Sequence, residues 1–350
     1  MEAMAINVEL LRRLCQAPGV PSREEAVARV VTAELGPLVD EVRSDALGNV
    51  VATKRGQGGP RVMLAAHMDE IGFLVRHVED KGFLRLQPMG GFDARALFAQ
   101  RVHVHTREGA LRGVLNAETK PIHLLRDEKP AVPALESYFV DLGLPAETVK
   151  QRVRVGDMVT MDRATEEIGD CVASKALDDR VGVFVMIEAL RHLRAHVAEV
   201  VAVATVQEEV GLRGATPAGY SVEPDVAIAI DITLAMDIAG SEEREAITQL
   251  GHGAAIKIMD SSLICDPRIV EAFRTIAERE GIAYQMEILP FGGTDAGGIQ
   301  RVREGVPSFT LSVPTRYVHT VDEMASTADI AAAYTLLARF LEQVQDFDLV

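Results

Sequence analysis

Histidine and carboxylate side chains follow apolar, strand-like segments of this sequence at several separate places. These residues are His67, Asp69, Glu208, Glu209, Asp231 and His319, and an acidic pair, Asp178 and Asp179, opens a predicted helix. In an α/β sheet, sites gather where the carboxyl ends of the strands meet. We therefore expect these side chains, which come from distant parts of the chain, to line one rim of a sheet.

This donor set, with two histidines, several carboxylates and no cysteine, favours a Zn²⁺, Co²⁺ or Mn²⁺ site over a structural zinc finger. The candidate ligands exceed what one zinc ion needs, and a carboxylate bridging a second ion would use the surplus. If the ligands are His67, Asp178, Glu209, Asp231 and His319, then three carboxylates, two divalent ions and one bridging hydroxide make a neutral site. Such a site supplies a nucleophile at neutral pH by lowering the pKa of water.

Two further carboxylates fit roles beside the ligands. Glu208 is adjacent to Glu209 and is the candidate proton acceptor, because one member of such a pair can bind metal while the other handles protons. Asp69 lies two residues after His67, and side chains at i and i+2 of an extended chain share a face. We therefore expect Asp69 to accept the second imidazole N–H of His67 and to orient the ring.

Each pattern also has an ordinary structural explanation when it is taken alone. The pair that begins at Asp178 would stabilise a helix N-terminus through the helix dipole. Glu208 and Glu209 would fit a solvated turn, and His319 would fit a buried histidine with satisfied hydrogen bonds. The joint placement of these residues after strands favours a common site.

The glycine-rich segment 291–298 leaves two interpretations open. It lacks the lysine of a phosphate-binding loop and the strand context of a dinucleotide-binding motif. It fits a tight turn into a helix that is capped by Thr294 or Asp295. It fits equally well a loop whose backbone approaches a substrate.

Apolar strands without alternation, separated by amphipathic helices, predict an α/β fold with a central mixed sheet flanked by helices. Ser22 and Glu25 resemble a capping box before a helix over 26–35. The turn at 56–60 predicts that the strands before and after it, 49–54 and 61–67, form a hairpin.

The pattern changes between residues 69 and 164, where short strand-like segments are punctuated by glycine and one helix is predicted around Ala146–Arg152. This is typical of a small β-rich module. We therefore expect a catalytic domain made of residues 1–68 and 165–350, interrupted by a β-rich insertion domain at 69–164.

The composition excludes several other classes of protein. Of 350 residues, 48% are hydrophobic and 25% are charged, as in ordinary globular proteins. A net charge of −16, 5% aromatic residues and no tryptophan argue against nucleic-acid binding. No apolar run reaches the roughly 18 residues of a membrane span. The N-terminus lacks a signal-peptide pattern and the three cysteines are widely spaced, so we expect a cytoplasmic protein with reduced thiols.

Six segments resemble, in the same order, the motif series of the tetrahedral (TET-type) aminopeptidases. These are dinuclear metallopeptidases whose members carry labels such as glutamyl aminopeptidase, leucyl aminopeptidase or endoglucanase. The segments are AHMDEIG (66–72), KALDDRVG (175–182), QEEVGLRGA (207–215), AIDIT (229–233), GGTDAGGIQ (292–300) and PTRYVHT (314–320). Together they span most of the chain.

The resemblance implies a role for each matching residue. The implied ligands are His67 and Asp231 for one metal, Glu209 and His319 for the other, and Asp178 as the bridge, with Glu208 as general base and Asp69 orienting His67. The resemblance also implies a cis peptide bond between Asp178 and Asp179. It further implies a β-rich insertion domain and assembly of dimers into a hollow dodecamer with inward-facing active sites.

The expected function is metal-dependent removal of N-terminal residues from short peptides, with two Zn²⁺ or Co²⁺ ions, or Mn²⁺, per subunit. A related metal-dependent deacylase or dipeptidase is the alternative within the same chemistry. An endoglucanase is disfavoured, because glycosidases use two carboxylates that flank the sugar and no metal. A metal-binding oligomeric shell without catalysis is the non-enzymatic alternative, and the retention of Glu208 beside the full ligand set argues against it.

Overall fold

The computed structural model describes residues 6–124 and 131–349. Its helices are α1 (Val8–Gln16), α2 (Glu25–Leu35), α3 (Ala146–Arg152), α4 (Leu177–His192), α5 (Ala215–Val222), α6 (Pro267–Glu280), α7 (Asp295–Ile299) and α8 (Thr327–Gln343). Its strands are β1 (Glu41–Ser44), β2 (Val50–Lys54), β3 (Arg61–His67), β4 (Gly72–Val78), β5 (Leu84–Met89), β6 (Gln100–Thr106), β7 (Gly109–Ala117), β8 (Tyr138–Asp141), β9 (Met158–Met161), β10 (Glu166–Ile168), β11 (Cys171–Ser174), β12 (Glu199–Thr205), β13 (Val226–Leu234), β14 (Ala254–Met259), β15 (Tyr284–Ile288), β16 (Ser308–Arg316) and β17 (Glu323–Ser326).

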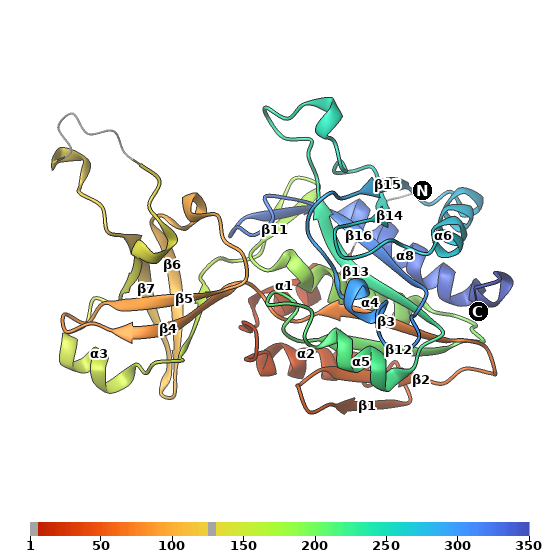
Figure 1. The fold of residues 1–350 in the computed structure, drawn as a ribbon, viewed down its shortest axis with the longest axis horizontal. Coiled ribbons are helices and arrows are strands. Elements are labelled where there is room, and N and C mark those ends of the chain that lie inside the picture. Colours follow the sequence, from red (N-terminus) through yellow and green to blue (C-terminus); the bar gives the residue numbers. More distant parts are fainter. Residues whose placement is uncertain (1–5, 125–130, 350) are drawn as a thin grey trace.

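A mixed sheet of eleven strands forms the larger part of the molecule (Figure 1). Its order is β1-β2-β12-β3-β13-β16-β17-β11-β10, and β14 pairs with both β16 and β15. The central strands β12, β3, β13 and β16 are parallel neighbours, whereas the strands toward both edges are mostly antiparallel. The carboxyl ends of the four central strands therefore meet at one edge of the sheet.

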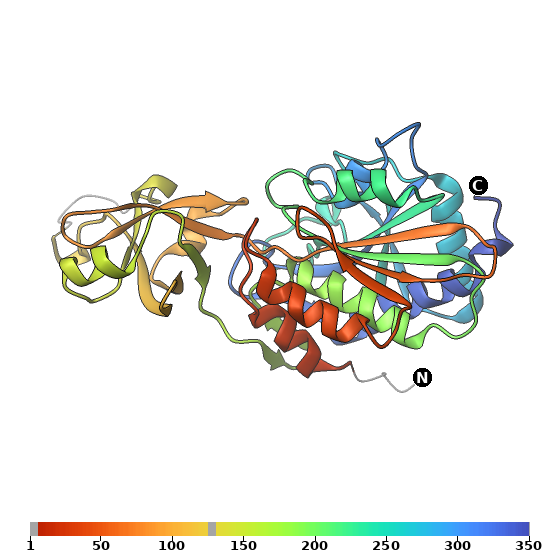
Figure 2. The same ribbon diagram turned by 90° about the horizontal axis from the view of Figure 1, so that it is seen from below.

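Helices cover both faces of this sheet (Figure 2). One face packs against α1, α2, α4, α6 and α8, and the other against the short helices α5 and α7. Because helices cover both faces, the central strands are buried along nearly their whole length; eight of the nine residues of β16, for example, are buried. The predicted α/β class with a mixed sheet flanked by helices is confirmed.

A second sheet closes on itself as a barrel in the order β4-β5-β8-β7-β6-β9. It has a core of its own that includes Phe73, Val104, Leu115 and Tyr138. The predicted helix at 146–152 is present as α3. The barrel strands all come from the segment predicted to be β-rich, although the domain limits at residues 69 and 164 stay a prediction.

Two local predictions are wrong. The strands β2 and β3 do not form a hairpin, because β12 inserts between them and pairs with both. Ser22 and Glu25 do not form a capping box; α2 begins after Glu24, and the backbone N–H of Ser22 donates to the Glu24 carboxylate at 2.8 Å. A strand distant in sequence replaces the hairpin, whereas the neighbouring Glu24 takes the Ser22 N–H that the capping box would have given to Glu25.

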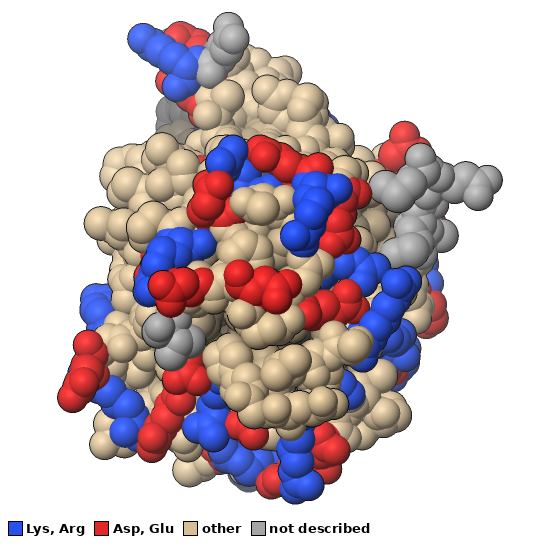
Figure 3. Space-filling model, turned by 90° about the vertical axis from the view of Figure 1, so that its right-hand side faces the viewer, with Lys and Arg blue, Asp and Glu red and all other residues tan. Residues whose placement is uncertain are grey.

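The surface carries charges of both signs. Acidic and basic side chains are interspersed on the face farthest from the barrel (Figure 3).

Among the helices of residues 6–124 and 131–349, none has the length and apolar character needed to cross a membrane.

Phe273 ties the helical layer to the strand β16 that leads toward His319. Its ring stacks on Phe309 and on Phe340, with ring centroids 4.4 Å apart in both pairs. Because Phe273 is fully buried, Phe273→Ala is expected to lower the free energy of unfolding by about 3–5 kcal/mol. Denaturant titration measures this change, and Phe98→Ala, which removes a ring that is 47% exposed, should change it by less than about 1 kcal/mol.

Candidate active site

The carboxyl ends of the central strands bring the predicted site residues together. His67 is the last residue of β3, Glu208 and Glu209 follow β12, and His319 follows β16. Asp231 lies inside β13, which continues to Leu234 rather than ending at Asp231. Asp178 comes from the start of α4, and the peptide bond to Asp179 is cis, as the resemblance implied.

Asp178 lies between the two histidines and presents one carboxylate oxygen to each. Its Oδ1 is 3.1 Å from His67 Nε2, and its Oδ2 is 3.2 Å from His319 Nε2. Two groups of donor atoms meet at this residue, each within 4.8 Å: His67, Asp178 and Asp231 on one side, and Asp178, Glu209 and His319 on the other. This is the arrangement that a carboxylate needs in order to contact two cations.

The donors fit divalent metal ions. All are imidazole nitrogens or carboxylate oxygens, which suit Zn²⁺, Co²⁺ and Mn²⁺. Oε1 of Glu209 is buried, lacks a hydrogen-bond donor within the described part of the chain, and lies 3.5 Å from His319 Nε2. Since a buried carboxylate oxygen without a partner is unfavourable, a cation at this position would satisfy it.

The electrostatics of the site also favour positive charge. Burial is the largest cause that raises the pKa of Asp231, Glu208 and Glu209, and neighbouring carboxylates add to it. Burial disfavours protonation of His319, but the adjacent carboxylates of Asp178 and Glu209 outweigh this effect and raise its pKa to about 11. The cluster holds protons because it concentrates negative charge away from water, and divalent cations would replace those protons.

Asp69 contacts His67 and also holds the turn that carries Glu208. The backbone oxygen of Asp69 lies 3.1 Å from His67 Nδ1, and its carboxylate oxygen Oδ1 lies 3.5 Å from the same nitrogen. The Asp69 carboxylate accepts the backbone N–H groups of Glu208 and Glu209 at 3.0 and 3.1 Å. The Asp69 carboxylate thus bonds mainly to backbone groups, which its spacing from His67 did not predict.

Two other buried carboxylates hold ligand-bearing backbone in the same way. Glu323 accepts the N–H of His319 at 2.9 Å and that of Asp178 at 3.0 Å. Asp179 accepts the N–H of His67 at 3.2 Å. Neither the Glu323 contacts nor the bond from His67 to Asp179 could be predicted from the sequence, where the available signal was an acidic residue within a candidate motif or close after it.

Glu24 also holds the turn that carries Glu208, through the backbone of the preceding residue, Gln207. Its Oε1 accepts the N–H of Gln207 at 3.1 Å as well as that of Ser22. Gln207 has a φ of 58°, in the left-handed region, so this turn needs partners that hold it. Burial, followed by the charge of Asp69, raises the pKa of Glu24 to about 7. Sequence reasoning missed Glu24 because its partner is remote in the chain.

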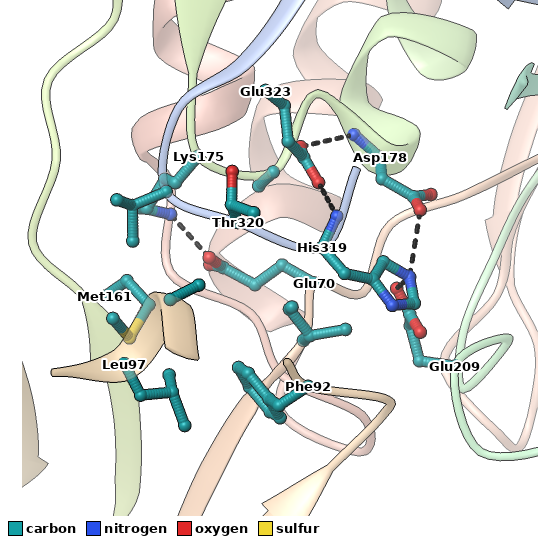
Figure 4. Close-up of a pocket in the computed structure, with 14 residues that line it drawn as sticks. Glu70, Phe92, Leu97, Met161, Lys175, Asp178, Glu209, His319, Thr320 and Glu323 are labelled. Atoms are coloured by element: carbon teal, nitrogen blue, oxygen red, sulfur yellow. Dashed lines mark hydrogen bonds and ion pairs between the residues drawn. The ribbon is translucent and has the colours of Figure 1, made fainter. Parts of the chain in front are cut away.

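Two hollows flank the site. The one toward the barrel is a small cavity of about 10 Å³ that lies beside Phe92, Leu97 and the buried Glu70–Lys175 ion pair (Figure 4). The other is an open groove of about 430 Å³ lined by both donor groups and by Glu208. Gly292, Gly293 and Thr294 line the groove before α7 begins, so the glycine-rich segment is both a turn into a helix and a groove wall.

The profile of the M42 glutamyl aminopeptidase family matches residues 48–336, which include every candidate ligand. The chain belongs to this family. Membership makes it a metal-dependent aminopeptidase, and the M42 family implies divalent metal ions, for which the two donor groups are candidates. The fold is shared with solved peptidase structures of the TET type.

Individual aminopeptidases and peptidases resemble the chain over nearly its whole length. A putative aminopeptidase of Acetivibrio thermocellus is 39% identical, with 94% of this chain and 96% of the relative covered. The structure of aminopeptidase APDkam598 from the archaeon Desulfurococcus kamchatkensis has a TM-score of 0.92 at 43% identity, covering 96% and 94%. The Pyrococcus horikoshii TET1 peptidase, which assembles into a tetrahedron or a large octahedral shell, has a TM-score of 0.84 at 31% identity, covering 95% and 98%.

Glu24 is expected to affect catalysis through the turn that carries Glu208. Glu24→Ala removes the acceptor of the Gln207 N–H and should lower kcat about tenfold, equivalent to about 1.4 kcal/mol, with KM little changed. Glu24→Gln keeps an acceptor oxygen and should restore most of kcat. Steady-state kinetics on one peptide measures both variants.

Glu25→Ala is the matched control, because Glu25 is the exposed neighbour of Glu24. Equal loss of kcat in the Glu25 and Glu24 variants would contradict a positioning role for Glu24. So would a lower melting temperature of Glu24→Ala with unchanged kcat.

Proposed function

We propose that the site removes N-terminal residues from short peptides with the help of two divalent ions, Zn²⁺ or Co²⁺, with Mn²⁺ as a further candidate. His67 and Asp231 would hold one ion, Glu209 and His319 the other, and Asp178 both. When bound, such ions polarise a carbonyl group and lower the pKa of water, which supplies a nucleophile at neutral pH. The observation that carries the proposal is the placement of Asp178, with one oxygen toward each histidine.

Glu208 is proposed as the general base. Its Oε2 lies 3.9 Å from His67 Nε2, and its side chain faces the groove without belonging to either donor group. Burial raises the pKa of Glu208 well above the usual value for a glutamate, which helps the carboxylate to take up a proton from water. It would then deliver that proton to the amine of the leaving peptide. Asp69 would position Glu208 through the backbone and orient His67 through the ring nitrogen.

A free N-terminal amine fits the negative charge of this groove. The carboxylates at one end of the groove attract an ammonium or amine group, whereas an N-acetyl group would offer no charge to them. The shells formed by the TET1 peptidase of Pyrococcus horikoshii support a homo-oligomer, for which we propose a dodecamer built from dimers. A cytoplasmic location is proposed on the basis of the three free cysteines.

The first experiment compares short peptides with free and acetylated N-termini. Metal-stripped enzyme should be inactive, and added Zn²⁺, Co²⁺ or Mn²⁺ should restore cleavage of the free peptides alone, measured by release of amino acids. Equal cleavage of acetylated peptides would assign the site to a deacylase or an endopeptidase. Absence of cleavage with every metal would favour the non-enzymatic shell.

A pair of variants separates the proton acceptor from the metal ligands. Glu208→Gln should retain both ions and lose about 10²–10⁴-fold in kcat, as is typical when a general base is removed. Asp178→Ala should lose metal, because it removes the oxygens shared by both donor groups. Metal analysis and steady-state kinetics distinguish the two roles. Near-normal turnover of Glu208→Gln, or unchanged metal content of Asp178→Ala, would contradict the assignments.

A further inference from the structure

We infer that this enzyme prefers peptides whose N-terminal side chain is apolar. The inference rests on the proposed function and names the side-chain class that its groove accepts. Apart from the proposed site residues, the groove of about 430 Å³ is lined by aliphatic, aromatic, glycine and threonine residues. Its large apolar members are Ile232, Leu234, Leu289, Phe291 and Val318.

The substrate side chain is expected to lie in this groove, because the space on the other side of the site is too small for it. The cavity toward the barrel has a volume of about 10 Å³, about the space that one water molecule needs (Figure 4). An aminopeptidase substrate has a single residue before the scissile bond, so that residue remains close to the catalytic groups. Whichever way the peptide runs, its first side chain therefore contacts the uncharged walls of the groove.

Among the described residues that line the groove, none is a lysine or an arginine, and two basic residues near it are already paired. The positive charge of Lys257 lowers the pKa of Asp231. However, Lys257 is fully buried, and its Nζ lies 2.5 Å from Oε1 of Glu287. Arg316, which ends β16, pairs with Asp237. A glutamate side chain of a substrate would thus lose water without gaining a cation.

A lysine side chain of a substrate meets the same difficulty. Among the described residues that line the groove, every carboxylate is a proposed metal ligand or the proposed base. An ammonium group could therefore pair only with a group that is needed for metal or for proton transfer. An apolar side chain needs no such partner and gains from burial against the walls.

Phe291 gives the groove an apolar wall that the rest of the protein does not cover. Its side chain is 81% exposed at the tip of the glycine-rich loop. The loop is held in place, since the backbone N–H of Ser261 donates to the oxygen of Gly292 at 3.2 Å. A Cβ on Gly293 would lie 2.9 Å from Ser262 Oγ, so the loop packs closely on that residue. Phe291 is thereby held beside the groove, where a substrate side chain can cover its ring.

The test compares kcat/KM for tripeptides that begin with Leu, Phe, Glu or Lys and end in Ala-Ala, using the full chain loaded with Zn²⁺ or Co²⁺. Leu and Phe peptides should exceed Glu and Lys peptides at least tenfold. A Glu or Lys peptide within tenfold of the Leu peptide overturns the inference and leaves the proposed function intact. Absence of cleavage of all four peptides overturns both. Calorimetric binding of free leucine, glutamate and lysine should give the same order without turnover.

Two variants assign the preference to the groove. Leu234→Arg places a cation at a half-buried wall position and should raise the Glu-to-Leu ratio of kcat/KM at least tenfold. Phe291→Ala should raise KM for the Leu and Phe peptides several-fold with kcat within twofold. Phe98→Ala, which removes another exposed ring outside the groove, should change neither value. An unchanged Glu-to-Leu ratio in Leu234→Arg overturns the assignment. An unchanged KM in Phe291→Ala does so as well, and this second variant keeps the inference testable if Leu234→Arg does not fold.

Discussion

The arrangement of the site depends on one constraint, the concentration of buried carboxylates at one edge of the sheet. Each carboxylate removed from water requires a proton, a hydrogen-bond donor or a cation. Asp69, Asp179 and Glu323 meet this requirement with backbone N–H groups, and in doing so they fix the turns that carry the other acidic residues. Those remaining residues have too few donors, and this deficit is what makes the edge suitable for divalent metal ions.

The sheet and the barrel contribute in different ways to this arrangement. The parallel strands β12, β3, β13 and β16 deliver residues to one edge, and apolar helices on both faces hold the strands in register. On the barrel side, side chains such as Phe92 and Leu97 close the space beside the donors, while the opposite side stays open. The substrate groove therefore exists because side chains pack the barrel side of the site and leave the opposite side open.

The sequence predicted much of this. Apolar runs identified the strands β3, β12 and β16, and the placement of His67, Glu208 and His319 after them identified the edge. What it missed depends on contacts that no local pattern contains. The pairing of β12 between β2 and β3 replaced the predicted hairpin, and no local pattern indicated that Glu24 accepts the N–H of the remote Gln207. The role of Glu323 was missed for the same reason. Its two partners lie on different elements, and only the folded chain brings them to one carboxylate.

The order of the site residues along the chain has a consequence for how the enzyme is made. His67 precedes the whole barrel, whereas His319 and the supporting Glu323 follow nearly every other element of the sheet. During synthesis from the N-terminus, the second donor group stays incomplete until these late residues have joined the sheet. A nascent chain of this peptidase therefore lacks its second donor group until nearly all of the chain has been made.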